Sequence, residues 1–170
     1  LARILQGDFG RSVVFQEEVS VLLWPRLART GLLAGLVLAF AIPISIILGI
    51  LAGMKEGSLQ DRSVSVLCII TTSVPEFCSA TLISWVFVFS LKWLPGTSSM
   101  ILGFSWKEMI LPVLVLVIYD FGYIARMTRA SMAEVMQTQY IRTAHLKGLP
   151  FHKVVLQHGL RNSLIAPFTV

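Results

Sequence analysis

Residues 134–161 read EVMQTQYIRTAHLKGLPFHKVVLQHGLR, a polar and basic segment between two apolar regions of the chain. The segment contains all three histidines and is interrupted once, at Gly148-Leu149-Pro150. Gly148 suits a left-handed helix C-cap, and proline is favoured in a first helical turn, where an N–H would have no partner anyway. The sequence therefore predicts a helix over 134–147, a tight turn and a second helix opened by Pro150, all facing water.

The composition indicates that the rest of the chain lies in a membrane. Hydrophobic residues make up 55% of the 170 residues and charged residues 14%, whereas charged residues make up about 25% of soluble domains. Three apolar segments are candidate membrane helices, about 30–54, 63–91 and 109–130, and a further apolar run begins at Asn162. The expected fold class is an all-α, polytopic membrane protein.

The second apolar segment is interrupted by Thr71-Thr72-Ser73-Val74-Pro75-Glu76. A Pro-Glu pair in lipid would be costly, so either the helix breaks there against protein or this part lies near an interface. In the first segment, Gly31/Gly35 and Gly49/Gly53 are pairs at a spacing of four that permit close helix packing. Glycine is also simply frequent in membrane helices, so the spacing alone leaves both explanations open.

Basic residues predict the orientation of the chain in the membrane. Six lysines and arginines follow Tyr123, against the single acidic residue Glu134. Because cytoplasmic loops are enriched in Lys and Arg, we expect the region after Arg126 to be cytoplasmic. Alternation of the helices then places 55–62 inside and 92–108 outside, with 1–29 as an extracytoplasmic loop and amphipathic lead-in.

The segment 134–161 resembles the cytoplasmic EAA loop of ABC-importer permeases. The match lies in Tyr140-Ile141-Arg142-Thr143-Ala144, in Lys147-Gly148 and in His158-Gly159-Leu160-Arg161-Asn162. Arg142 and Thr143 stand where the general pattern has Glu and Ala, His158 replaces Ile, and Arg161 replaces Pro. These departures are habitual in the dipeptide, oligopeptide and nickel branch and favour it.

A second resemblance concerns the N-terminal region. Gly7-Asp8-Phe9-Gly10-Arg11-Ser12 is similar to a segment that follows the first membrane helix in the B-type subunit of peptide permeases. The alternative is an ordinary turn punctuated by glycines.

The resemblance implies the fold of a type I ABC importer permease, here a fragment that lacks the first and last membrane helices. It implies helices within 30–133, with a bent entry near Pro75 and a spanning part nearer 77–91, a coupling loop over 134–161 and the start of a further helix over 162–170. The residues matched to the coupling loop, which would contact an ATPase, are Tyr140, Arg142, Thr143, Ala144, Lys147, Gly148, His158, Leu160, Arg161 and Asn162.

The resemblance also implies partners and a location. The expected partners are a second, C-type permease subunit, two ABC ATPase subunits, an extracytoplasmic substrate-binding protein and the lipid bilayer, with no nucleic acid. The expected location is the cytoplasmic (inner) membrane, crossed several times, and the expected substrates are peptides or nickel. The sequence contains no Gly-x-x-x-x-Gly-Lys-Ser/Thr motif, so we expect no enzymatic activity and no cofactor in this chain, with ATP bound by the partner subunits.

Other residues with possible chemistry are Asp120 and the histidines. Asp120 lies within the segment 109–130, where a carboxylate is a functional candidate by default and could line a translocation path or pair with another helix. His145, His152 and His158 are separated by seven and six residues across the Gly148 turn, unlike the spacings that place two metal ligands on one helical face. We therefore predict no metal site.

A different class of function is a membrane protein without transport activity, whose basic segment binds anionic lipid or nucleic acid. Such binding requires only charge. The uncharged residues Thr143, Ala144, Gly148, Leu160 and Asn162 stand at matched positions, and this pattern favours transport.

Overall fold

The computed structural model describes residues 7–99 and 104–169, apart from the side chains of His145 and Ala166. Within these ranges the chain is helical and has no β-strand beyond one isolated bridge, between Arg11 and Glu18. The internal contacts divide the chain within one helix into a unit ending at Leu36 and a larger unit beginning at Val37. The structure confirms the expected all-α fold.

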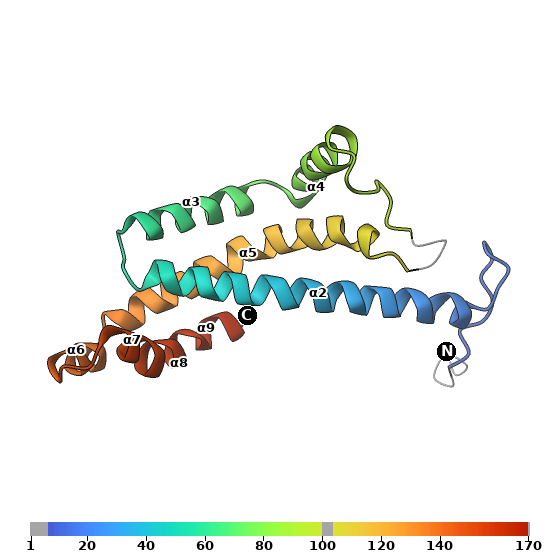
Figure 1. Cartoon of the computed structure of the whole chain (residues 1–170). Helices are drawn as coiled ribbons and strands as arrows, with labels where there is room; N and C mark the ends of the chain where they lie inside the picture. The colour runs from blue at the N-terminus through green and yellow to red at the C-terminus, as the bar shows by residue number, and fades with distance from the viewer. Residues whose placement is uncertain (1–6, 100–103, 170) are drawn as a thin grey trace. The chain divides into compact units, whose positions relative to one another are not determined.

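Figure 1 shows the order of the helices along the chain. They are α2 (Val19–Gly53), α3 (Leu59–Ser73), α4 (Glu76–Ser84), the π-helical η1 (Trp85–Ser90), α5 (Trp106–Met136), α6 (Gln139–Leu146), α7 (Phe151–Lys153), the π-helical η2 (Val154–Gly159), α8 (Leu160–Ser163) and α9 (Ile165–Phe168). The predicted loop 96–108 falls partly on residues 100–103, which lie outside the described residues.

In the N-terminal unit, the described residues 7–18 form a series of turns before α2. Gly7 and Gly10 have positive φ angles of 83° and 73°, a backbone region that side-chain-bearing residues rarely adopt. The Gly10 N–H donates to Asp8 Oδ1 over 2.9 Å, and the Arg26 guanidinium lies 5.3 Å from the centre of the Phe15 ring. The glycine-punctuated segment is therefore a turn, whatever its further role.

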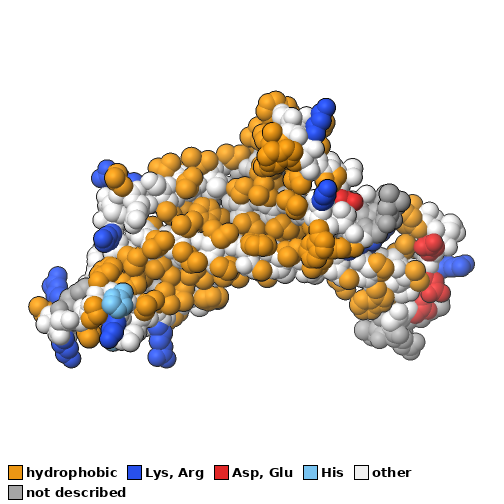
Figure 2. Space-filling view, viewed as in Figure 1, with side chains coloured by type: hydrophobic (Ala, Val, Ile, Leu, Met, Phe, Trp, Pro, Cys, Tyr) orange, Lys and Arg blue, Asp and Glu red, His pale blue; other side chains and the backbone are white. Residues whose placement is uncertain are grey.

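Two of the described helices, α2 and α5, are long and apolar enough to cross a membrane. Both are longer than the predicted segments: α2 begins at Val19 and includes the expected lead-in, and α5 runs from Trp106 to Met136. Ile47, Phe77 and Phe89 are more than half exposed, and Figure 2 shows hydrophobic side chains covering much of the visible surface. Such a surface suits lipid or the helices of a partner.

The predicted interruption near Pro75 is a sharp bend. Helix α3 ends at Ser73, α4 begins at Glu76, and the two directions differ by 98°. Residues 76–90 rise only about 22 Å at 1.5 Å per residue, less than a hydrocarbon core of roughly 30 Å. The segment predicted over 77–91 is thus too short to cross the membrane by itself, and the bent pair forms a third span only if α3 contributes to it.

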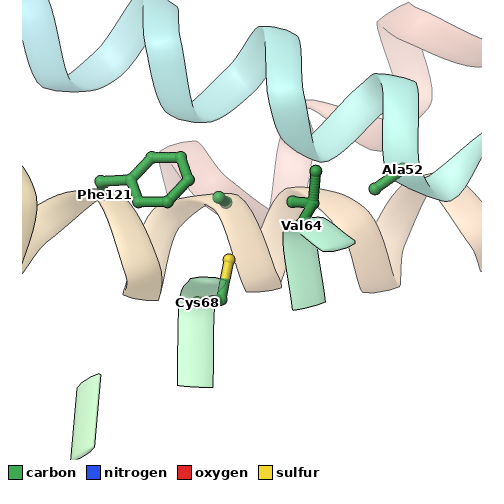
Figure 3. Close-up of a cluster of buried hydrophobic side chains, with 5 residues drawn as sticks. Ala52, Val64, Cys68 and Phe121 are labelled. Atoms are coloured by element: carbon green, nitrogen blue, oxygen red, sulfur yellow. The ribbon is translucent and has the colours of Figure 1, made fainter. Parts of the chain in front are cut away.

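The core of the larger unit lies where α2, α3 and α5 meet. Figure 3 shows Ala52, Val64, Cys68 and Phe121 directed toward one another from these three helices. Their apolar side chains are buried, and Ala52 has no exposed surface.

Glycines allow the helices around this core to approach closely. A Cβ atom added at Gly49 would lie 2.6 Å from Thr128 Cβ and 2.7 Å from the Ala125 carbonyl oxygen of α5, and one added at Gly53 would lie 2.6 Å from the Arg129 carbonyl oxygen. Since real Cβ atoms do not approach so closely, the 49/53 pair is a helix-packing motif, one of the two explanations left open. At Gly31 and Gly35 an added Cβ would meet no described atom within 4 Å.

Candidate functional site

The turn in segment 134–161 has the geometry predicted from Gly148. Gly148 has a φ angle of +75°, and the Leu149 N–H donates to the Ala144 carbonyl over 3.3 Å, the bond of a Schellman cap. Pro150 lies just before α7 as its N-cap, and its carbonyl accepts from the N–H groups of Lys153 and Val154. The structure confirms the turn and a helical segment on each side of it, although Pro150 precedes the second helix instead of opening its first turn.

The first helix of the segment is shorter than predicted. Glu134 belongs to the end of α5, which stops at Met136. The prediction of one helix over 134–147 is therefore wrong. The break lies at Thr138, whose N–H and hydroxyl both donate to the Val135 carbonyl, over 3.1 and 2.6 Å. Its own carbonyl then accepts from the Arg142 N–H over 3.2 Å, so Thr138 occupies the N-cap position of α6.

The inner face of α6 packs against the second helix of the loop. Ile141, Ala144 and Val154 form a buried cluster, with Leu149 of the turn packed against it. Ala144 is only 6% exposed, so the close approach that its small side chain permits is made within this chain. Any effect of Ala144 on a partner is therefore exerted through the shape of the loop.

Tyr140 and Asn162, at the two ends of the matched pattern, are brought together. The Asn162 side-chain amide donates to the Tyr140 hydroxyl over 3.0 Å, across 22 residues of sequence. This bond ties α6 to α8. Thr143 is exposed, and its hydroxyl donates to the Gln139 carbonyl within α6 over 2.9 Å.

The second helix of the loop packs on the membrane helices. Val155 is buried with Ile50 of α2 and Met132 of α5, and Leu160 lies against the same cluster. Gly159 is buried, and an added Cβ there would lie 3.0 Å from Met132 Cε. The second loop helix is therefore packed against α2 and α5.

The second loop helix also contains a feature that the sequence reading missed. Residues Val154–Gly159 are π-helical, and the cap N–H of Leu160 bonds the Val155 carbonyl. Widened turns of this kind occur frequently at functional sites. His158 lies in this segment and is half-buried, whereas His152 is exposed.

The outer face of the loop is basic around one apolar residue. Arg142, Lys147 and Arg161 are exposed, and none of them forms an ion pair within the described ranges. Leu146 is 83% exposed at the end of α6. The sequence reading missed Leu146 because a leucine in a helix is normally assigned to a core.

The histidines do not form a metal site in the part of the chain that the structure describes. No group of three or more His, Cys, Asp or Glu side chains comes close enough there to hold a metal ion. The His145 side chain lies outside the described residues.

An ion-pair network beside the loop was also missed. The Arg129 guanidinium donates to both carboxylate oxygens of Asp61, over 2.8 and 2.7 Å. Asp61 is only 4% exposed and also accepts from the Gly57 N–H. Glu56 accepts from Gln137 over 2.9 Å, so the polar connector at 55–62 is bonded to the end of α5, immediately before α6.

Asp120 lies apart from the loop, in a polar pocket between α3 and α5. The pocket has a volume of about 400 Å³ and is lined by Thr72, Tyr119, Asp120, Tyr123, Ile124 and Arg126. The residues that line the pocket beside Asp120 are therefore mostly polar, and most of them come from α5 itself.

Comparison with known proteins identifies the family. Residues 45–170 match the family described as binding-protein-dependent transport system inner membrane component. The whole chain is 38% identical over 174 residues to a Brucella abortus protein named as a peptide transport system permease, of which it covers 55%. It is 33% identical over 169 residues to the oligopeptide transport system permease protein OppB of Salmonella typhimurium, with 97% of this chain and 54% of OppB covered.

Escherichia coli OppB is 32% identical over 166 residues, with 97% of this chain and 54% of that protein covered. The chain thus spans about half the length of the relatives that it matches. The family match covers well over half of the chain and includes α5, the whole segment 134–161 and the 49/53 glycine pair. The chain belongs to the family of binding-protein-dependent transport system inner membrane components.

Proposed function

We propose that this chain is part of a permease subunit of an ATP-driven ABC importer for di- or oligopeptides or nickel, located in the inner membrane and crossing it several times. It forms part of the translocation path together with a second permease subunit. Two ABC ATPase subunits bind it through the cytoplasmic loop 134–161, and an extracytoplasmic binding protein delivers the substrate. The relatives named as peptide and oligopeptide permeases support this proposal.

The observation that carries the proposal is that α6 has one face buried within the loop and one face exposed. Its inner face, with Ile141 and Ala144, is buried within the loop. Its outer side presents Leu146, 83% exposed, beside Arg142 and Lys147. An apolar knob with a basic rim on a short helix suits docking into a groove of a protein partner.

The packing of the loop supplies a route for force. The ATPase moves α6, and the Tyr140–Asn162 bond and the buried Val154 carry that movement to the second loop helix. Val155 and Leu160 pass it to Ile50 and Met132 on α2 and α5. Because a packed core transmits displacement instead of absorbing it, the membrane helices rock between outward and inward access.

The alternative of lipid or nucleic-acid binding is less well supported. Attraction to phosphates needs only Arg142, Lys147 and their basic neighbours, and it gives no reason for an exposed leucine between them. Docking into a groove depends on the shape of the contact, whereas attraction to phosphates depends on the salt concentration.

Gly148→Val tests the proposal. The φ angle of +75° is strained for any L side chain, by roughly 1–2 kcal/mol, although an added Cβ would meet no described atom within 4 Å. We expect normal amounts of protein in the membrane and peptide uptake reduced at least tenfold, because the turn that orients α6 is altered.

Gly57→Val is the matched control, since Gly57 has a φ angle of +78° and open space around it, outside the loop. Its uptake should stay within threefold of the unsubstituted chain, and both variants should be assayed for co-purification of the ATPase. Unaltered uptake with Gly148→Val would refute the assignment of the coupling loop.

A further inference from the structure

The polar pocket around Asp120 combines opposite charges in a membrane-buried setting. Tyr119, Tyr123 and Arg126 are spaced by four and three residues on α5 and therefore form one stripe, with Asp120 at its edge and Thr72 of α3 opposite. Its volume of about 400 Å³ falls in the range of roughly 300–1,000 Å³ that is usual for small-molecule sites. Charged groups at such a position are expensive and usually functional.

The cationic side of the pocket is held in place. The Arg126 guanidinium donates to the Thr72 hydroxyl over 3.1 Å, and that hydroxyl donates to the Cys68 carbonyl over 2.8 Å. Gly122 brings the two helices together, since an added Cβ would lie 2.9 Å from the Cys68 carbonyl oxygen. A guanidinium has five N–H donors, so Arg126 keeps donors for a ligand.

The acidic side, in contrast, has no partner in the described part of the chain. The half-buried Asp120 carboxylate forms no hydrogen bond or ion pair there. A carboxylate that is partly removed from water and lacks a partner is a site for a cation.

We propose that this pocket binds the backbone of a short peptide during translocation, with the N-terminal ammonium group at Asp120 and a carbonyl or the C-terminal carboxylate at Arg126. The tyrosine hydroxyls hydrogen-bond the amide groups between them. This inference rests on the proposed transport function and selects peptides within it.

The positions of Asp120 and Arg126 along α5 suit a peptide of about three residues. The two residues are six positions apart, a rise of about 9 Å along the helix axis, and an extended peptide covers about 3.3 Å per residue. Nickel fits less well, because Ni²⁺ favours imidazole and mixed nitrogen and oxygen ligands, whereas Asp120 is the only carboxylate among the residues lining this pocket and no histidine or cysteine joins it.

The test uses the complete transporter with Ile124→Cys as a reporter in the pocket, in a background of Cys68→Ala and Cys78→Ser that retains peptide uptake. A water-soluble thiol reagent should label the reporter. Trialanine should slow labelling at least fivefold, and N-acetyl-trialanine, which lacks the ammonium group, less than twofold. Asp120→Asn should abolish the protection, whereas Glu17→Gln, at an exposed carboxylate outside both the pocket and the loop 134–161, should preserve it.

Several results would overturn the inference while uptake remains intact: no labelling of the reporter, no protection by trialanine, equal protection by both peptides, or protection that survives Asp120→Asn. Peptide uptake in the same preparation tests the proposed function separately. Protection without any uptake would reject the importer function and support the binding site. Uptake without protection would reject the binding site and support the importer function.

Discussion

Replacing Leu146 by alanine should weaken binding of the ATPase more than removing any one charge of the loop. Leu146 is 83% exposed, so its truncation should change the stability of this chain by less than about 0.5 kcal/mol. In a groove, truncation removes three carbon groups at about 0.8 kcal/mol each, a loss of roughly 2 kcal/mol. That loss corresponds to about thirtyfold in Kd.

The comparison variants separate apolar docking from charge and from loop shape. Lys147→Gln removes an exposed charge worth about 1 kcal/mol or less, at most about fivefold, with an effect that shrinks as salt is added. Ala144→Leu adds volume to the buried cluster with Ile141 and Val154 and should cost roughly 1–3 kcal/mol in the stability of the loop itself.

The assay is titration of purified ATPase subunits onto the solubilised permease subunits at two salt concentrations, with thermal unfolding measured in parallel. Leu146→Ala should weaken binding equally at both salts without lowering Tm, whereas Ala144→Leu should lower Tm as well. The reasoning is refuted if Leu146→Ala binds within twofold of the unsubstituted chain while Lys147→Gln has the larger, salt-dependent effect. That outcome would favour the lipid or nucleic-acid alternative.

Three further predictions follow from the packing and the charge pattern. Gly49→Leu should destabilise the protein in detergent by roughly 1–3 kcal/mol, since its Cβ would lie 2.6 Å from Thr128 Cβ. The control Gly35→Leu has open space around it and should leave Tm within about 2 °C of the unsubstituted protein. Equal Tm values for the two variants would disprove the α2–α5 contact. Asp61→Asn and Arg129→Gln should each destabilise the protein by somewhat less than the roughly 3–5 kcal/mol that breaking a fully buried ion pair costs, because the Arg129 side chain is 26% exposed. The double variant should lose little more stability than either single variant. Additive losses in a double-mutant cycle would show that the two residues are not coupled. A cysteine at Gly96 should react with a membrane-impermeant reagent in intact cells and one at Lys153 only after permeabilisation; the opposite pattern would invert the proposed topology.

The features that could be predicted from the sequence are those set by composition or by local backbone rules. The hydropathy of the sequence located α2 and α5. The glycine at position 148 indicated a left-handed turn, because few other residues adopt a positive φ. The bend at Pro75 was marked by the Pro-Glu pair. These features depend on neighbours within a few residues.

The features that were missed depend on contacts between distant segments. Asp61 and Arg129 are 68 residues apart, and nothing in the polar connector 55–62 indicates which basic residue pairs with the aspartate. Leu146 and Ala144 lie two residues apart on one short helix, yet one is exposed and the other buried. That difference follows from where the second loop helix packs. The break at Thr138 was readable in principle, since threonine is a favoured N-cap, but the apolar pattern runs through it.

The most direct test of the central claim is photo-cross-linking from position 146 in membranes that contain the complete transporter. A photoreactive residue in place of Leu146 should form an adduct with the ABC ATPase subunit. Trp93, 67% exposed and expected on the opposite side of the membrane, provides the matched position and should form no such adduct. Absence of the adduct from position 146 in a transporter with normal uptake, or an ATPase adduct from position 93, would contradict the proposal that α6 couples this chain to its ATPase.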